Sequence, residues 1–333
     1  MHIPDNYLSP STCIVLALVS IPVLKISLNK AKEELGMKKM SSIAVYSAFS
    51  FIIMMFNIPL PGGTSGHAVG SALTALIMGP WVSVISTSIA LIIQAIFFGD
   101  GGIISLGANI FNMAILMPFT AYYTNRILKN FIKKDKFNAF ISGYISLNLA
   151  ALFTAIEFGV QPLLFKDSLG LPLYCPYPLS VSIPAMMVGH ITLFGLAEIV
   201  LTVVVLAFVE KVSPAALDNV PEKSSFKPLY ILIGALIVLT PIGLLATGTA
   251  WGEWGVDEMA TLVSGGTQLG YTPSGMESGF ELSTLFPDYS MTGMPEWTGY
   301  ILSAVVGVAL LVIFFKIISS LMKDKVDFKK KAA

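Results

Sequence analysis

Charged residues are scarce in this chain of 333 residues: they make up 12% of it, whereas a soluble globular domain carries about 25%. So little charge cannot cover a water-facing surface. The composition therefore excludes an ordinary soluble enzyme, a disordered protein and a nucleic-acid-binding protein with a basic face. The two cysteines are too few for a disulfide framework or a Cys-based zinc site. What is abundant is apolar sequence, at 55% with a mean hydropathy of +0.78, which indicates a polytopic helical membrane protein.

Two catalytic signatures are also missing from the sequence. It contains no GxxxxGK[ST] loop for nucleotide phosphates and no HExxH zinc-protease motif. The three histidines are His2, His67 and His190, and no Ser/His/Asp arrangement can be assigned from spacing.

The apolar segments predict an all-α bundle of about nine transmembrane helices, because a bilayer-spanning helix needs about 20 mainly apolar residues. The third segment is short and ends at Gly79-Pro80-Trp81, which predicts a tight turn since proline cannot continue the preceding helix. The expected spans are 10–25, 40–58, 67–79, 81–99, 105–124, 138–160, 180–209, 229–246 and 298–318.

The basic residues predict the orientation of the chain. With these spans, every lysine and arginine except Lys166 falls on one side of the membrane. The positive-inside rule makes that side cytoplasmic. We therefore expect a protein of the cell membrane with its N-terminus outside the cell and its C-terminus in the cytoplasm. The first lysine, Lys25, follows the first apolar run, so the start does not resemble a signal peptide.

A charged, proline-containing linker at 213–228 divides the chain into a seven-span part, 1–212, and a two-span hairpin, 229–333. The hairpin contains a long polar stretch, 247–297, with acidic residues and no lysine or arginine. This stretch is either a plain solvated loop or a negatively charged mouth that concentrates cations.

The start Met1-His2 can chelate a transition metal. The Met1 amine, the His2 backbone nitrogen and His2 Nδ1 together form fused rings around one ion, a nitrogen set that suits Ni(II) or Cu(II), with Co(II) also possible. His67 follows a Gly/Pro-rich stretch on the same side and offers a fourth nitrogen. The alternatives are a solvated chain start for His2 and an interfacial histidine bonded to a backbone carbonyl for His67.

Other polar residues lie within or beside the spans. Asn109 and Asn112 are neighbours on a helix. They are candidates to orient a metal-binding histidine by a hydrogen bond, without binding the metal themselves. His190 and Glu198 lie about two turns apart within one span, where ionisable groups are costly; a structural bond or a metal role fits both. Cys13 and Cys175 fall on the outer side, where a disulfide is permitted, but two separate thiols are expected.

Ala44 and Ala48 form a small-xxx-small pair in the second span. Such pairs let two helices approach closely, so this face is a candidate docking site for a partner helix.

The opening MHIPDNYLSP resembles the MHIPDGFLSP start of the CbiM/NikM family, the substrate-binding membrane components of cobalt and nickel energy-coupling-factor transporters. One departure is Asn6 where the family usually has glycine, and asparagine tolerates the left-handed backbone. The C-terminal part resembles the family's small two-helix N component, here fused. The resemblance continues at His67–Ser71, Gly79–Trp81, Phe97–Gly102, Gly107–Met113, Gly189–Thr192, Glu198, Gly248–Gly255 and Pro287–Tyr289.

This resemblance implies that Met1, His2 and His67 hold transported Ni(II) or Co(II), and that the N-terminal segment folds back into the bundle. It also implies two kinds of partner, a transmembrane coupling protein that docks at Ala44 and Ala48 and two cytoplasmic ATPases. No organic cofactor and no nucleic acid are expected, and the chain itself is not an enzyme.

Two alternatives stay open. A secondary metal transporter without ATPases would need carboxylates inside the spans, where Glu198 is deep and Glu157 lies near an end. A membrane-bound metal-dependent enzyme would need an open metal position and a general base.

Overall fold

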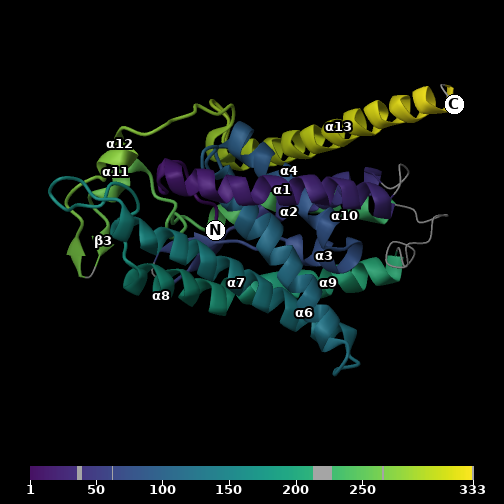
Figure 1. Ribbon diagram of the computed structural model, residues 1–333, viewed down its shortest axis with the longest axis horizontal. Coiled ribbons are helices and arrows are strands. Elements are labelled where there is room, and N and C mark those ends of the chain that lie inside the picture. The colour runs from purple at the N-terminus through teal and green to yellow at the C-terminus, as the bar shows by residue number, and fades with distance from the viewer. Residues whose placement is uncertain (36–39, 62, 213–226, 265, 332–333) are drawn as a thin grey trace.

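Long helices lie side by side in a single bundle (Figure 1). The computed structural model describes the chain except for residues 36–39, 62, 213–226, 265 and 332–333. Most of the linker expected at 213–228 therefore lies outside the described residues. The irregular segments between α10 and α13, with α11, α12 and β3, gather at one end of the bundle, and the C-terminus lies at the other (Figure 1).

The N-terminal part contains both α-helices and π-helical segments, which are labelled η. Its elements are α1 (Pro10–Leu35), α2 (Met40–Met54), β1 (Ile58–Leu60), β2 (Thr64–Gly66), α3 (Ser71–Met78), α4 (Pro80–Ile93), η2 (Gln94–Phe98), α5 (Leu106–Asn109), η3 (Ile110–Leu116), α6 (Met117–Leu128), α7 (Asp135–Leu164), α8 (Leu179–Gly189), η4 (His190–Phe194) and α9 (Gly195–Val212).

The C-terminal part has two long helices and a loop-rich stretch between them; its η6 and η7 are 3-10 turns. Its elements are α10 (Lys227–Leu239), η6 (Thr240–Leu245), α11 (Val256–Met259), β3 (Val263–Ser264), β4 (Thr267–Gln268), α12 (Ser274–Glu277), η7 (Pro287–Tyr289) and α13 (Glu296–Lys331).

The chain is a multi-pass helical membrane protein, but nine spans are not confirmed. Among the described residues, six helices are long and apolar enough to cross a bilayer. The expected span at 67–79 is only the short α3, and that at 40–58 is reduced to an apolar helix at Ile43–Met54. The expected span at 105–124 is a succession of α5, η3 and α6. The qualifying helices are Pro10–Glu33, Pro80–Phe98, Asp135–Leu164, Leu179–Val212, Lys227–Leu245 and Glu296–Ile318.

Two backbone features place the polar loops. Gly79, with φ 86°, ends α3 and also precedes α4, whose first residue is Pro80, so the predicted tight turn is confirmed. Strands β1 and β2 form an antiparallel hairpin in which Ile58 pairs with Gly66. The hairpin ends at Gly66, so His67 lies in the short segment between β2 and α3.

Helix α2 is enclosed by helices of its own chain. It packs against α4, α10 and α13, and Ala44 and Ala48 are both buried. Gly307 of α13 lies so close to Phe51 of α2 that a Cβ there would overlap its ring. Ala44 and Ala48 thus lie buried in a helix that packs against helices of the same chain, and their docking to a partner helix stays a prediction.

Candidate metal site

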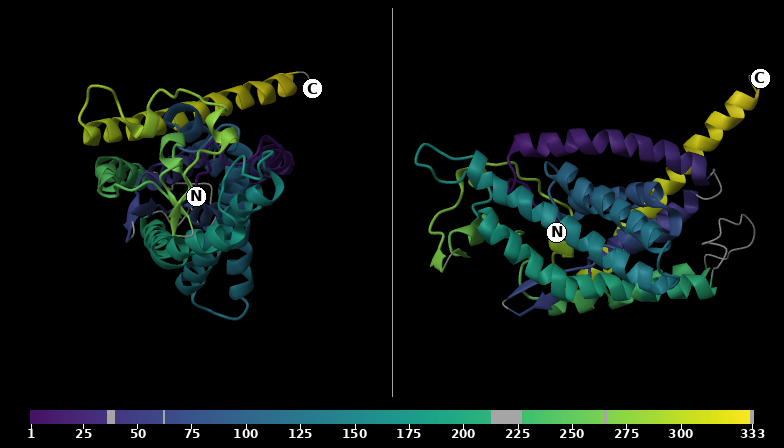
Figure 2. Two further views of the ribbon diagram at one scale, coloured as in Figure 1. Left: turned by 90° about the vertical axis from the view of Figure 1, so that its left-hand side faces the viewer. Right: turned by 60° about the horizontal axis from the view of Figure 1, so that its bottom comes forward.

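The N-terminus lies in the interior of the protein, among the helices (Figure 2). Met1, His2 and Ile3 are all buried, with 6%, 2% and 0% of their surface exposed. Burying a chain end removes its polar backbone from water, so these groups require partners inside the protein.

The side chain of Asn109 supplies two of those partners. Its Oδ1 accepts the N–H of Ile3 at 2.7 Å and its Nδ2 donates to the Ile3 carbonyl at 3.0 Å, as a neighbouring strand would. The same carbonyl also accepts from the Gly102 N–H at 2.9 Å and from the Ser105 hydroxyl. Asn109 thus fixes the backbone beside His2, whereas the sequence had predicted that it would orient an imidazole ring.

The next residues turn the chain out of the interior. The Asp5 carboxylate accepts backbone N–H groups of Ile103 at 2.9 Å and Ile104 at 2.8 Å, and it lies where a side chain on Gly102 would have to be. Asn6 has φ 68°, so the predicted left-handed turn is confirmed. Its side chain pairs with the backbone N–H and carbonyl of Phe280, which ties the acidic loop to the N-terminus.

Three polar side chains meet at His2. His2 Nδ1 lies 3.2 Å from His67 Nε2 and 2.9 Å from Asp100 Oδ1. Opposite ligands on metal–nitrogen bonds of about 2 Å would lie about 4 Å apart, so the two imidazole nitrogens are spaced as adjacent ligands. Among the described residues, no three His, Cys, Asp or Glu side chains enclose a metal ion by themselves. A metal bound here would therefore require backbone or amine nitrogens as well.

The hydrogen bond of His67 determines which nitrogen is free. His67 Nδ1 lies 3.0 Å from the carbonyl of its neighbour Ala68, so this nitrogen carries the proton and Nε2 offers its lone pair toward His2. Burial, together with the nearby His2 and the N-terminal amine, lowers the pKa of His67 to about 3. The ring is thus neutral near pH 7, which is the form that binds metals.

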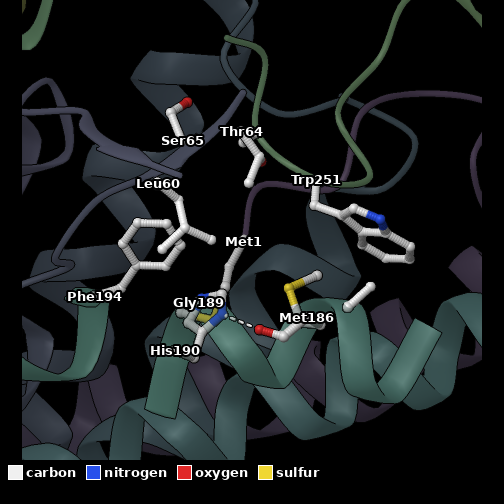
Figure 3. A pocket seen from close by; sticks show the side chains of 12 residues that line it. Met1, Leu60, Thr64, Ser65, Met186, Gly189, His190, Phe194 and Trp251 are labelled. Carbon is white, nitrogen blue, oxygen red and sulfur yellow. Dashed lines mark hydrogen bonds between the residues drawn. The ribbon is translucent and has the colours of Figure 1, made fainter. Parts of the chain in front are cut away.

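The amine of Met1 is paired with the C-terminal part. It donates to Glu253 Oε1 at 3.1 Å. The Met1 side chain enters a small pocket of about 20 Å³ between Met186, Gly189, His190 and Trp251 (Figure 3). In this pocket His190 Nδ1 bonds to the Met186 carbonyl at 2.7 Å, which gives His190 a structural partner beside the site.

Asp100 and its supports were missed by the sequence analysis. Tyr289 of the C-terminal part donates its hydroxyl proton to Asp100 Oδ2, and Gln94 Nε2 donates to the same atom at 3.1 Å. Burial would raise the pKa of Asp100, but its contacts with His2, His67 and the Tyr289 hydroxyl together outweigh this and the net direction is downward, so the carboxyl is ionised. The signal in the sequence was the stretch Phe97–Gly102, which belongs to the resemblance but was given no role at the metal.

The carboxylate of Glu198 braces the segment that carries His67. It accepts the N–H of Val69 at 2.7 Å and that of Gly70 at 3.2 Å, at the start of α3. Of the two possibilities left open, the structure thus gives Glu198 a bond to backbone rather than a position beside the imidazoles. Such outer partners orient metal ligands.

We expect Glu198→Gln to weaken metal binding about tenfold, because an amide NH₂ would face backbone N–H donors and displace His67. The matched control is Glu157→Gln, a second buried glutamate whose Oε2 accepts from Asn112 at 2.8 Å. Calorimetric titration with Ni(II) measures both. Equal affinity of Glu198→Gln and the unsubstituted protein would show that the brace does not matter.

Two remaining expectations have clear outcomes. Asn112, in η3, donates its Nδ2 to Glu157 Oε2 at 2.8 Å, so among the described residues its partner is a carboxylate and the structure gives no support to its expected role behind a histidine. Cys13 and Cys175 are separate buried thiols, as predicted.

Comparison with known proteins identifies the family. Residues 2–216 match the CbiM model, described as a cobalt uptake substrate-specific transmembrane region, and residues 227–324 match the PDGLE domain. The chain belongs to the CbiM family. The resemblance found in the sequence, including the fused C-terminal part, is therefore confirmed.

Relatives in the CbiM family share this fused design. The chain is 41% identical to a probable fused nickel transport protein LarMN of Lactiplantibacillus plantarum, covering 95% of this chain and 97% of that protein. It is 43% identical to a fused nickel transport protein NikMN of Rhodobacter capsulatus, covering 94% and 95%. A crystal structure of a truncated transition metal transporter matches with 48% identity and a TM-score of 0.61, covering 63% of this chain and 99% of that one.

Proposed function

We propose that this chain binds Ni(II) or Co(II) as its transported substrate, through the Met1 amine, the His2 backbone nitrogen, His2 Nδ1 and His67 Nε2. The observation that carries the proposal is that the buried N-terminus brings His2 Nδ1 to 3.2 Å from His67 Nε2. The relatives that are named nickel or cobalt transport proteins support it. Late first-row ions have the strongest affinity for such nitrogen ligands and accept planar geometry.

The proposal extends to the transport step. The chain is the substrate-specific component of an ATP-driven energy-coupling-factor transporter, with a transmembrane coupling protein and two cytoplasmic ATPases as partners. We place the metal site on the outer side of the membrane. The positive-inside rule assigns the basic segments to the cytoplasmic side, and the metal site is expected on the opposite side. A secondary transporter and a metal-dependent enzyme are the competing functions.

Metal titration of the purified full chain tests the binding proposal. We expect one Ni(II) or Co(II) per chain, no binding of Mg(II), and a visible d–d band of low-spin planar nickel without a thiolate charge-transfer band. Absence of Ni(II) and Co(II) binding would refute the proposed function. Nickel uptake by vesicles then tests coupling: uptake without the ATPases would favour the secondary transporter.

A further inference from the structure

A cavity of about 570 Å³ opens beside the proposed metal site. His2 and His67, which are buried, and Asp100 line it, and residues 246–250 form another part of its wall. The volume is many times the roughly 30 Å³ of one water molecule in the liquid. The cavity therefore has room for a metal ion together with its hydration shell.

The lining of this cavity is strongly acidic. Five carboxylates of the C-terminal part contribute to it, in addition to Asp100. They are Glu253, Asp257, Glu258, Asp288 and Glu296. The described lining residues include no lysine or arginine, and the sequence has none between 247 and 297.

The solvent exposure of the carboxylates decreases from the mouth of the cavity toward the histidines. Asp257, Asp288 and Glu296 are exposed, and Glu253 and Asp100 are half-buried. His2 at the inner end is buried, and its Nε2 has no hydrogen-bond partner among the described residues. Although part of Asp288 reaches solvent, partial desolvation in the cavity and the nearby charges of Asp100 and Glu253 raise its pKa. These negative groups repel one another, and a cation among them would relieve the repulsion.

We infer that this acidic vestibule captures the metal as a free hydrated cation and excludes anionic metal chelates. The inference rests on the proposed function and names the form of its substrate. Clefts lined with one sign of charge focus the field and raise association rates by about 10- to 1,000-fold. The same carboxylates repel a complex of net negative charge, such as nickel citrate.

Association kinetics test the vestibule in the purified full chain. The test variant is Asp257→Asn/Asp288→Asn; asparagine suits the left-handed backbone of Asp288, at φ 50°. The matched control is Glu277→Gln/Glu281→Gln, which removes two charges from the same loop at exposed positions outside the cavity lining.

At low ionic strength we expect NiCl₂ to bind the test variant about tenfold more slowly than the unsubstituted protein, with an unchanged dissociation rate. The difference should shrink to less than about twofold at 1 M salt, where the screening length is about 3 Å. The control variant should bind as fast as the unsubstituted protein. If both variants slow equally, net charge and not the vestibule is responsible, and if neither slows, the inference fails.

A second measurement addresses the chelate. At constant free Ni(II), set by a citrate buffer, the binding rate should not change as total nickel citrate rises. A rate that increases with the complex would overturn the exclusion of chelates. Either failure, in a protein that still binds NiCl₂, leaves the proposed function intact, whereas absence of NiCl₂ binding refutes the proposed function itself.

Discussion

Adding one glycine before Met1 should abolish high-affinity binding of Ni(II) and Co(II). The extension converts the amine into an amide and moves the new amine away from His2, so the fused chelate rings cannot form. The structure adds a second reason, because the charged amine donates to Glu253 Oε1 at 3.1 Å, and an uncharged amide at this place would lose that ion pair. Substituting a residue that supports a metal ligand lowers metal affinity about 10- to 100-fold, and the loss of the chelating amine should lower it further.

The matched control carries the same glycine after Ala333, at the opposite end of the chain, and should bind like the unsubstituted protein. Calorimetry measures affinity, and thermal unfolding checks that both proteins are folded. An N-terminally extended protein that binds nickel with unchanged affinity would remove Met1 from the site.

Replacing His67 by alanine should lower the affinity for Ni(II) by more than about hundredfold, because an imidazole ligand is lost from a site with few other donors. Water can fill the vacant position, so weak residual binding is expected. The matched control is His190→Ala: His190 is equally buried, but its Nδ1 bonds to the Met186 carbonyl. Its affinity should stay within a few-fold. The opposite result, with His190→Ala inactive and His67→Ala unaffected, would exchange the two assignments.

The pH dependence of binding separates His67 from the other nitrogens. Because its pKa is lowered to about 3, His67 gains no proton in mildly acidic solution and does not compete with the metal there. Binding nevertheless releases protons from the other nitrogens, so affinity should fall as pH falls. In mildly acidic solution the affinity of His67→Ala should therefore fall with pH as steeply as that of the unsubstituted protein. The measurement is the number of protons released per nickel bound, which should be equal in the two proteins.

The amino-acid sequence alone determined the class of protein and much of the local structure. Low charge and long apolar runs required a helical membrane protein, and Gly79-Pro80 and Asn6 specified turns through their backbone preferences, which are local properties. The opening motif and His67 likewise sufficed to name the ligand candidates and the family. These conclusions need no knowledge of which helices touch.

The tertiary structure decided the contacts between distant residues. Asp100 with Tyr289, Met1 with Glu253, and Glu198 with Val69 join segments more than 120 residues apart. An apolar helix that is hydrophobic all round does not reveal which face meets a neighbour. The burial of Ala44 and Ala48 and the turn of Asn112 toward Glu157 were therefore outside the reach of sequence, because they depend on helix rotation and packing within the bundle.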